Sequence, residues 1–89
     1  MHAIVVRVTI NDVETATQFL NDQVVPRASA APGFVAGYWT RGEDASNGLS
    51  MIVFESEDAA QAASGQIQST DPEGASIDSV ELREVVANA

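Results

Sequence analysis

The segment His2–Ile10 has the sequence HAIVVRVTI, which is rich in β-branched residues and typical of a β-strand. Alternate side chains of a strand point to opposite faces of its sheet. One face of this strand is aliphatic, with Ile4, Val6, Val8 and Ile10. The other face begins apolar and ends polar, in the order Ala3, Val5, Arg7 and Thr9. A strand that is apolar on both sides needs a cover on both faces of its sheet.

A helix is predicted to follow this strand. Asn11 is positioned as an N-cap, so the helix begins near Asp12. Its less polar side chains recur at helical spacing: Val13, Ala16, Thr17, Leu20 and Val24. Pro26 cannot donate a backbone hydrogen bond, so the helix either ends by Val25 or continues with a kink to Ala30. We favour the kinked helix.

A hairpin is predicted in the middle of the chain. Pro32-Gly33 ends the helix, and residues 34–40 (FVAGYWT) have the aromatic and β-branched content of a strand. Residues 41–48 (RGEDASNG) form a polar loop. Residues 49–54 (LSMIVF) then form a third strand, which is again apolar on both faces.

A second helix and a fourth strand complete the order. Ser56 is placed to cap a helix over Glu57–Gln68, and acidic residues in its first turn interact favourably with the helix dipole. The apolar side of this helix is nearly all small: Ala59, Ala60, Ala63 and Ile67, with Gly65 within the helix. A turn at residues 71–74 (DPEG) precedes a strand at residues 77–86, with Val80, Leu82 and Val86 on one face.

The order β-α-β-β-α-β predicts one α+β domain over residues 1–89, with a ferredoxin-like fold. Its four-stranded antiparallel sheet would carry both helices on one face. No element is left to cover the other face, so we expect a homodimer that packs sheet against sheet. The alternative is a monomer that tolerates an apolar face.

Composition excludes several classes of function. Thirteen acidic residues against four arginines give a net charge of −9, which repels nucleic acid and anionic membranes. The absence of cysteine excludes disulfides, thiolate metal sites and a cysteine nucleophile. The N-terminal segment lacks the features of an export signal, so we expect a cytoplasmic protein.

Few side chains are candidates for chemistry. His2 is the only histidine, and the carboxylates lack metal-ligand spacing, so we expect neither a metal nor a cofactor. Tyr38 and Trp39 are consecutive in a strand and must face opposite sides of the sheet. Arg7 is placed either to pair with Glu81 on the last strand or to bind an anion. Tyr38, Trp39 and Arg7 are therefore the weak catalytic candidates.

The alanine-rich helix either packs very close to the sheet or leaves a cavity above it. A cavity would hold a small apolar or aromatic ligand beside Tyr38 or Trp39. Its other lining residues would be Val6, Leu20, Ile52, Phe54, Ala59 and Ala63.

Two short motifs carry a resemblance. Pro32-Gly33-Phe34 with Gly37, and residues 54–59 (FESEDA), resemble the dimeric α/β-barrel superfamily, within it the antibiotic-biosynthesis-monooxygenase type. The resemblance implies a sheet-to-sheet homodimer with its ligand between sheet and helices. Three positions depart from the family pattern, in which Phe54 is commonly Trp, Ala63 is commonly His, and Val6 is Asn in haem-degrading members. Haem chemistry is therefore disfavoured.

Two hypotheses of function follow. The first is a cofactor-independent monooxygenase that acts on a small aromatic or quinol-type molecule, which can itself reduce oxygen. The second is a non-catalytic homodimeric module that binds a small ligand or serves in assembly. The residues favour the second hypothesis and the resemblance favours the first, so the sequence leaves open whether the protein is an enzyme.

Overall fold

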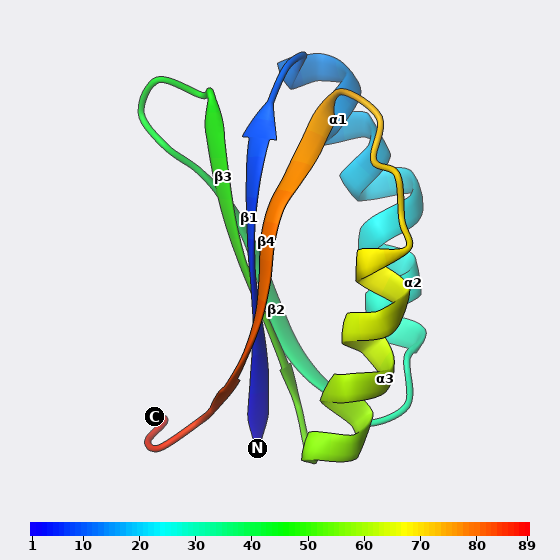
Figure 1. Cartoon of the computed structure of the whole chain (residues 1–89), viewed down its shortest axis with the longest axis vertical. Helices are drawn as coiled ribbons and strands as arrows, with labels where there is room; N and C mark the ends of the chain where they lie inside the picture. Colours follow the sequence, from blue (N-terminus) through cyan, green and yellow to red (C-terminus); the bar gives the residue numbers. More distant parts are fainter.

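The computed structural model describes all residues, 1–89, and contains two layers (Figure 1). One layer is an antiparallel sheet with strand order β2-β3-β1-β4, and the other consists of helices on one face of that sheet. In chain order the elements are β1 His2–Ile10, α1 Val13–Phe19, the π-helix η1 Leu20–Val24, α2 Val25–Ala30, β2 Phe34–Arg41, β3 Asn47–Phe54, α3 Glu57–Gln68 and β4 Ala75–Glu84. The predicted ferredoxin-like order is confirmed.

Strand β1 lies in the interior of the sheet, between β3 and β4. Four consecutive residues, Ala3, Ile4, Val5 and Val6, are at most 6% exposed, so this part of β1 is buried on both faces within the single chain, whereas the sequence predicted a bare second face. The core on the helix side combines side chains of β1, β3 and α3: Ile4, Val6, Ile52, Phe54 and Ala60. No helix in the chain has both the length and the apolar character needed to cross a membrane.

The helix after β1 runs from Val13 to Ala30 in three consecutive segments, so its predicted continuation through Pro26 is confirmed. The helix accommodates Pro26 through a π turn, in which the Val25 N–H donates a hydrogen bond to the Leu20 carbonyl. The predicted N-cap is wrong. Asp12 caps the helix by accepting a hydrogen bond from the Thr15 N–H at 3.1 Å.

The side chain of Asn11, the predicted cap, instead donates a hydrogen bond to Ser76 Oγ on β4, at 3.4 Å. The hairpin loop is also shorter than expected, because β2 extends to Arg41 and β3 starts at Asn47. Within this loop the Ser46 N–H donates to the Asp44 carboxylate at 3.0 Å and holds the pKa of Asp44 below its usual value.

Strand β4 starts two residues earlier than predicted and contains a register shift. Arg7 pairs with Ser79 while Val8 pairs with Ile77, which leaves Asp78 as an extra residue. Ile77 and Val80 therefore both pack against the core. The predicted face was wrong at Val86, which lies beyond the strand and is 88% exposed.

Helix α3 has the predicted bounds and the predicted cap, with Ser56 Oγ accepting from the Ala59 N–H at 3.2 Å. Its small apolar side faces the sheet. Gly65 does not share that side, because a Cβ atom there would have no neighbour within 4 Å. The buried small residue at that level is Ser64, which is 5% exposed.

The two short motifs meet at one end of the sheet. Gly33 has a φ of +81°, and its carbonyl accepts a hydrogen bond from the Glu55 N–H at 2.8 Å. A Cβ atom on Gly33 would lie 2.8 Å from Ala59 Cβ. The Phe34 and Phe54 rings pack edge to face, with centroids 6.2 Å apart. The end of α2 and the start of α3 are thus joined beside the same sheet end (Figure 1).

Substitution of Gly33 with alanine tests this junction. Because of its positive φ and the close Ala59 contact, we expect Gly33→Ala to lower the free energy of unfolding by about 1–3 kcal/mol. Gly65→Ala is the matched control and should raise that free energy by about 0.5–1 kcal/mol, since alanine favours a helix and meets no atom there. Urea denaturation measures both, and equal effects would contradict the assignment.

Candidate functional site

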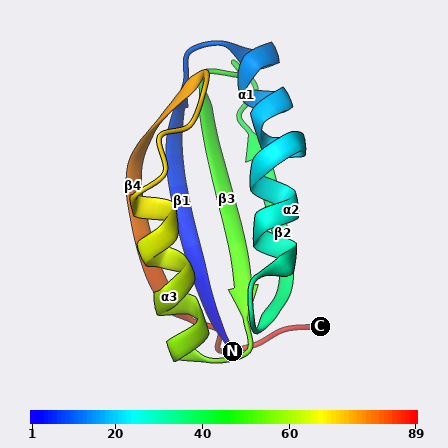
Figure 2. The ribbon, with the colours of Figure 1, turned by 90° about the vertical axis from the view of Figure 1, so that its right-hand side faces the viewer.

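The layer between helices and sheet is incompletely filled. Only 11 of the 89 residues are buried, and within the helical segment Val13–Ala30 only Ala16 is among them. The five-residue core instead draws its helical member, Ala60, from α3. Figure 2 shows α3 over the β4 and β1 side of the sheet and the α1-to-α2 helix over the other side. Two open hollows lie in this layer.

The first, the Trp39 hollow, has a volume of about 580 Å³ and lies between the α1-to-α2 helix and strands β2 and β3. The residues that matter to its chemistry are Thr17, Phe19, Leu20, Trp39, Arg41 and Ser50. Trp39 and Ser50 are cross-strand neighbours that both face the helices. A Cβ atom on Gly37 would lie 2.6 Å from Trp39 Cη2, so the indole lies over the bare backbone of Gly37.

Arg41 supplies the cation of this hollow. Its guanidinium donates a hydrogen bond to Thr17 Oγ1 at 3.2 Å, and no carboxylate lies within 4.0 Å of it. Thr17 in turn donates to the Val13 carbonyl at 2.8 Å, which fixes its hydroxyl. In a chain with a net charge of −9, a guanidinium without an acidic partner beside an indole ring suits an aromatic anion.

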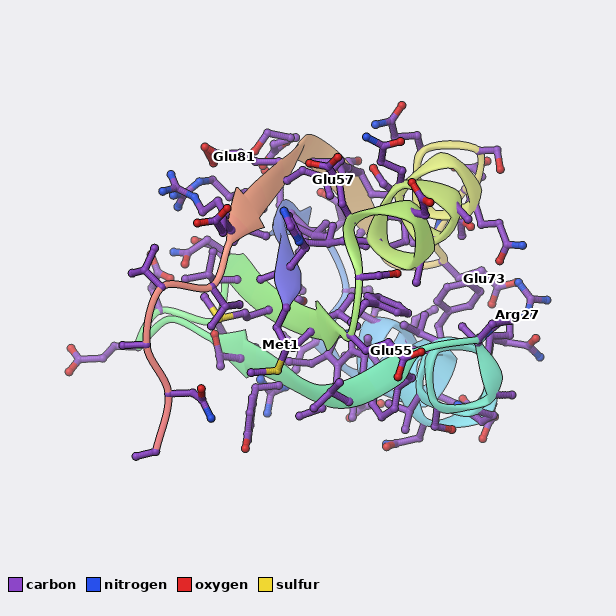
Figure 3. The ribbon with its side chains drawn as sticks, turned by 90° about the horizontal axis from the view of Figure 1, so that it is seen from below. Met1, Arg27, Glu55, Glu57, Glu73 and Glu81 are labelled. Carbon is purple, nitrogen blue, oxygen red and sulfur yellow. The ribbon has the colours of Figure 1, made fainter.

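The second, the Phe54 hollow, has a volume of about 640 Å³ and lies between α2, α3 and β3. Ile52, Phe54 and Ala63 form its apolar wall, and Arg27 lies at its rim. Arg27 donates a hydrogen bond to Gln23 Oε1 at 3.1 Å and also lacks a carboxylate partner. Figure 3 shows Arg27 and Glu73 on the helix side of the sheet and Glu81 beyond β4.

The predicted pocket residues are distributed over three places. Leu20 lines the Trp39 hollow, whereas Ile52, Phe54 and Ala63 line the Phe54 hollow. Val6 and Ala59 line neither hollow and pack in or against the core.

The sheet separates the three catalytic candidates. Trp39 packs on the helix side, whereas Tyr38 and Arg7 pair with Met51 and Leu49 on the opposite face. The predicted Arg7–Glu81 ion pair is wrong. Arg7 pairs in register with Ser79, and Glu81 binds Arg83 at 2.8 Å.

Sequence reasoning missed Arg41 and Ser50. Their positions carried a usable signal, because Arg41 lies two residues from Trp39 and Ser50 two residues from Ile52 in the same strands. Alternation therefore places both on the helix side once that face is known. His2 lies outside both hollows, with Nε2 3.5 Å from Glu57 Oε2 at the start of α3.

The face of the sheet opposite the helices, here called the open face, is apolar over β2 and β3. Its exposed apolar side chains include Tyr38, Leu49 and Met51, which are 41–67% exposed. Polar and charged side chains occupy the adjoining β4 side, where Glu81 and Arg83 form their ion pair. The open face is thus a patch with a charged border.

The chain matches no protein-family model and no curated protein. It is similar in structure to a monooxygenase from the gene ActVA-Orf6 of Streptomyces coelicolor, crystallised with the ligand nanaomycin D. The TM-score is 0.57 and the identity 13%, and the match covers 99% of this chain and 92% of that one. The similarity shows a shared fold.

The position of the Trp39 indole over the Gly37 backbone can be tested by fluorescence, because Trp39 is the only tryptophan. In Gly37→Ala the new methyl group would collide with the indole and displace it from the backbone. We expect a shift of the tryptophan emission maximum, and Gly65→Ala, whose added methyl meets no atom, should leave the emission unchanged. An unchanged emission spectrum in folded Gly37→Ala would show that the indole does not lie over the Gly37 backbone.

Proposed function

We propose that the Trp39 hollow binds a small hydroxylated aromatic molecule of the quinol type, and that the chain oxidises it with molecular oxygen and without a cofactor. The observation that carries the proposal is the pairing of Trp39 with Arg41 in one hollow, with Arg41 free of any acidic partner. The volume of about 580 Å³ is within the range of small-molecule sites, about 300–1,000 Å³.

Each side chain has a separate task in this proposal. Trp39 provides a flat apolar surface on which an aromatic ring stacks. Arg41 faces the hydroxyl oxygen of the ligand, and a guanidinium there favours the ionised phenolate. Ser50 and Thr17 offer hydroxyl groups that can hydrogen-bond further oxygen substituents. The phenolate proton needs an acceptor, and Glu73 is the carboxylate that lines the same hollow.

The reaction balances without an added reductant. An electron-rich hydroxyarene such as 1,5-dihydroxynaphthalene reacts with one dioxygen to give a hydroxynaphthoquinone and one water. One oxygen atom bonds to the ring carbon para to the ionised hydroxyl, and the other leaves as water. The hydrogens of that ring carbon and of the hydroxyl end in the water, and the substrate supplies all the electrons. The protein's part is to orient the ring and to favour the phenolate.

The fold supports this class of function. The similarly folded monooxygenase was crystallised with a ligand, nanaomycin D. The proposed site here lies in the layer between sheet and helices, where the family resemblance of the two motifs implies a ligand.

The test uses 1,5-dihydroxynaphthalene under labelled dioxygen, with mass spectrometry of the quinone. We expect one labelled oxygen atom per product molecule. Arg41→Gln should lower kcat/KM by about tenfold or more, since it removes a charge-assisted contact to the phenolate. Trp39→Leu should lower it comparably through loss of the stacking surface. Arg83→Gln is the control, because Arg83 pairs with Glu81 outside the hollows and its loss should leave kcat/KM unchanged.

One observation favours a second candidate, binding without turnover. Glu73 is exposed, and no histidine lines the Trp39 hollow, so a proton acceptor is available only at its solvent side. Quenching of Trp39 emission by dihydroxynaphthalene with no labelled product would reject the oxygenase and support a ligand-binding module. Absence of both quenching and product would reject both candidates.

We also propose that two copies associate through the open face, because its exposed side chains Tyr38, Leu49 and Met51 form one apolar patch. Met51 lies within this patch, opposite Val5 on one side and Tyr38 on the other. The homodimer is the assembly that the motif resemblance implies.

Light scattering tests the dimer. We expect twice the chain mass for the wild type and a shift to the single-chain mass in Met51→Glu, which places a charge within the patch. Gln61→Glu adds the same charge on an exposed position of α3 and should leave the mass doubled. A wild-type protein that remains at the single-chain mass would contradict the proposal.

A further inference from the structure

The Trp39 hollow and the Phe54 hollow have one lining residue in common, Phe19. Other parts of their walls are neighbours in sequence. Val24 lines one hollow and Val25 the other, and Asp71 and Pro72 divide in the same way. The two hollows therefore adjoin, and the Phe19 side chain belongs to the wall between them.

The floor of the layer is continuous across this boundary. Ser50 lines the Trp39 hollow and Ile52 lines the Phe54 hollow, and they are successive helix-facing residues of β3. Two residues of a strand span only about 7 Å. The two volumes thus follow one another along β3.

Phe19 lies at the end of α1, where its side chain lines both hollows. It is the last residue of α1 and immediately precedes the π turn Leu20–Val24. Its side chain is only half-buried, in contrast to the fully buried Phe54 of the core. The chain therefore keeps an aromatic ring between two hollows where it contributes little to the packed core.

Each hollow is also lined by one arginine. Arg41 lines the Trp39 hollow and Arg27 lines the Phe54 hollow, and neither has a carboxylate partner. They are two of only four basic side chains in the sequence. A planar molecule that extended from one hollow into the other would meet Phe19, the one residue that lines both.

We propose that Phe19 determines the length of the ligand: it confines an aromatic anion to the Trp39 hollow and excludes molecules of three linear rings. This inference rests on the proposed ligand site beside Trp39. Removal of the phenyl ring would join the two hollows into one channel along β3, open to a longer polycyclic anion with an arginine at each end.

Two probes that differ by one fused ring test the partition, 2-naphthoate and anthracene-2-carboxylate. Trp39 emission reports binding, because this single tryptophan lies in one of the two hollows. For the wild type we expect 2-naphthoate to bind about tenfold or more tightly than anthracene-2-carboxylate. In Phe19→Ala we expect the affinity for anthracene-2-carboxylate to rise by about tenfold or more, and the ratio of the two affinities to shift toward the three-ring probe by at least as much.

Phe19→Met is the second variant, because a flexible thioether keeps apolar contacts for folding yet can move aside. It should give a smaller gain for the three-ring probe. Val24→Ala is the matched control, since it removes bulk from the same helical segment but lines only the Phe54 hollow. Its affinity for anthracene-2-carboxylate should remain that of the wild type. Circular dichroism and thermal unfolding establish that each variant is folded.

The outcomes separate the two proposals. Binding of 2-naphthoate to the wild type without any gain for anthracene-2-carboxylate in folded Phe19→Ala or Phe19→Met overturns the partition alone. An equal gain in Val24→Ala also overturns it, because enlargement of one hollow would then suffice. If neither probe quenches Trp39 in the wild type or in the Phe19 variants, the ligand site beside Trp39 and the partition are both rejected.

Discussion

The close approach of the Gly33 backbone to the first turn of α3 is the contact on which the helix layer depends. Gly33 lies in the turn between the helical segment that ends at Ala30 and β2; it has a positive φ, accepts the Glu55 N–H and leaves no room for a side chain against Ala59. This one backbone site therefore joins the turn before β2 to the start of α3. The end of α2 and the start of α3 are therefore held together at this end of the sheet (Figure 1).

The helical segment Val13–Ala30 packs loosely on the sheet. Pro26 cannot occupy a regular α-helix interior without losing a hydrogen bond and clashing with the preceding turn. The π turn before it widens the helix, so the helical segment continues past Pro26 to Ala30. Apart from Ala16, this segment buries no residue, and the side chains that it directs inward, such as Phe19 and Leu20, line hollows. The π turn that accommodates Pro26 and the residues that line the hollows thus belong to the same helical segment.

Sequence patterns predicted what depends on alternation and local capping. The bounds of β1 and α3, the opposite faces of Tyr38 and Trp39, and the doubly apolar β1 all follow from side-chain periodicity, and the structure confirms them. What alternation cannot predict is a change of register. The extra residue Asp78 brings both Ile77 and Val80 to the core. Arg7 pairs in register with Ser79, and Glu81 forms its ion pair with Arg83 instead.

The candidate site shows the same limit. The predicted pocket residues share one face of the sheet or of its covering helices, but their division into two hollows depends on the distance between helix and sheet. The spacing between helix and sheet has no periodic signature in the sequence. Arg41 and Ser50 were within reach of alternation, whereas the place of Phe19 between two hollows required the three-dimensional arrangement.

Because the buried core is small, the unfilled hollows and the exposed open face both affect the stability of the folded chain. A domain of this size buries a modest share of its surface, and this one also leaves a layer unfilled on one side of the sheet and an apolar face on the other. A molecule that binds only the folded chain stabilises it, whether it enters the hollows or covers the open face. The two effects meet in β2, where Tyr38 and Trp39 are consecutive residues on opposite faces. A dimer contact at Tyr38 and a ligand contact at Trp39 would therefore involve adjacent residues of one strand.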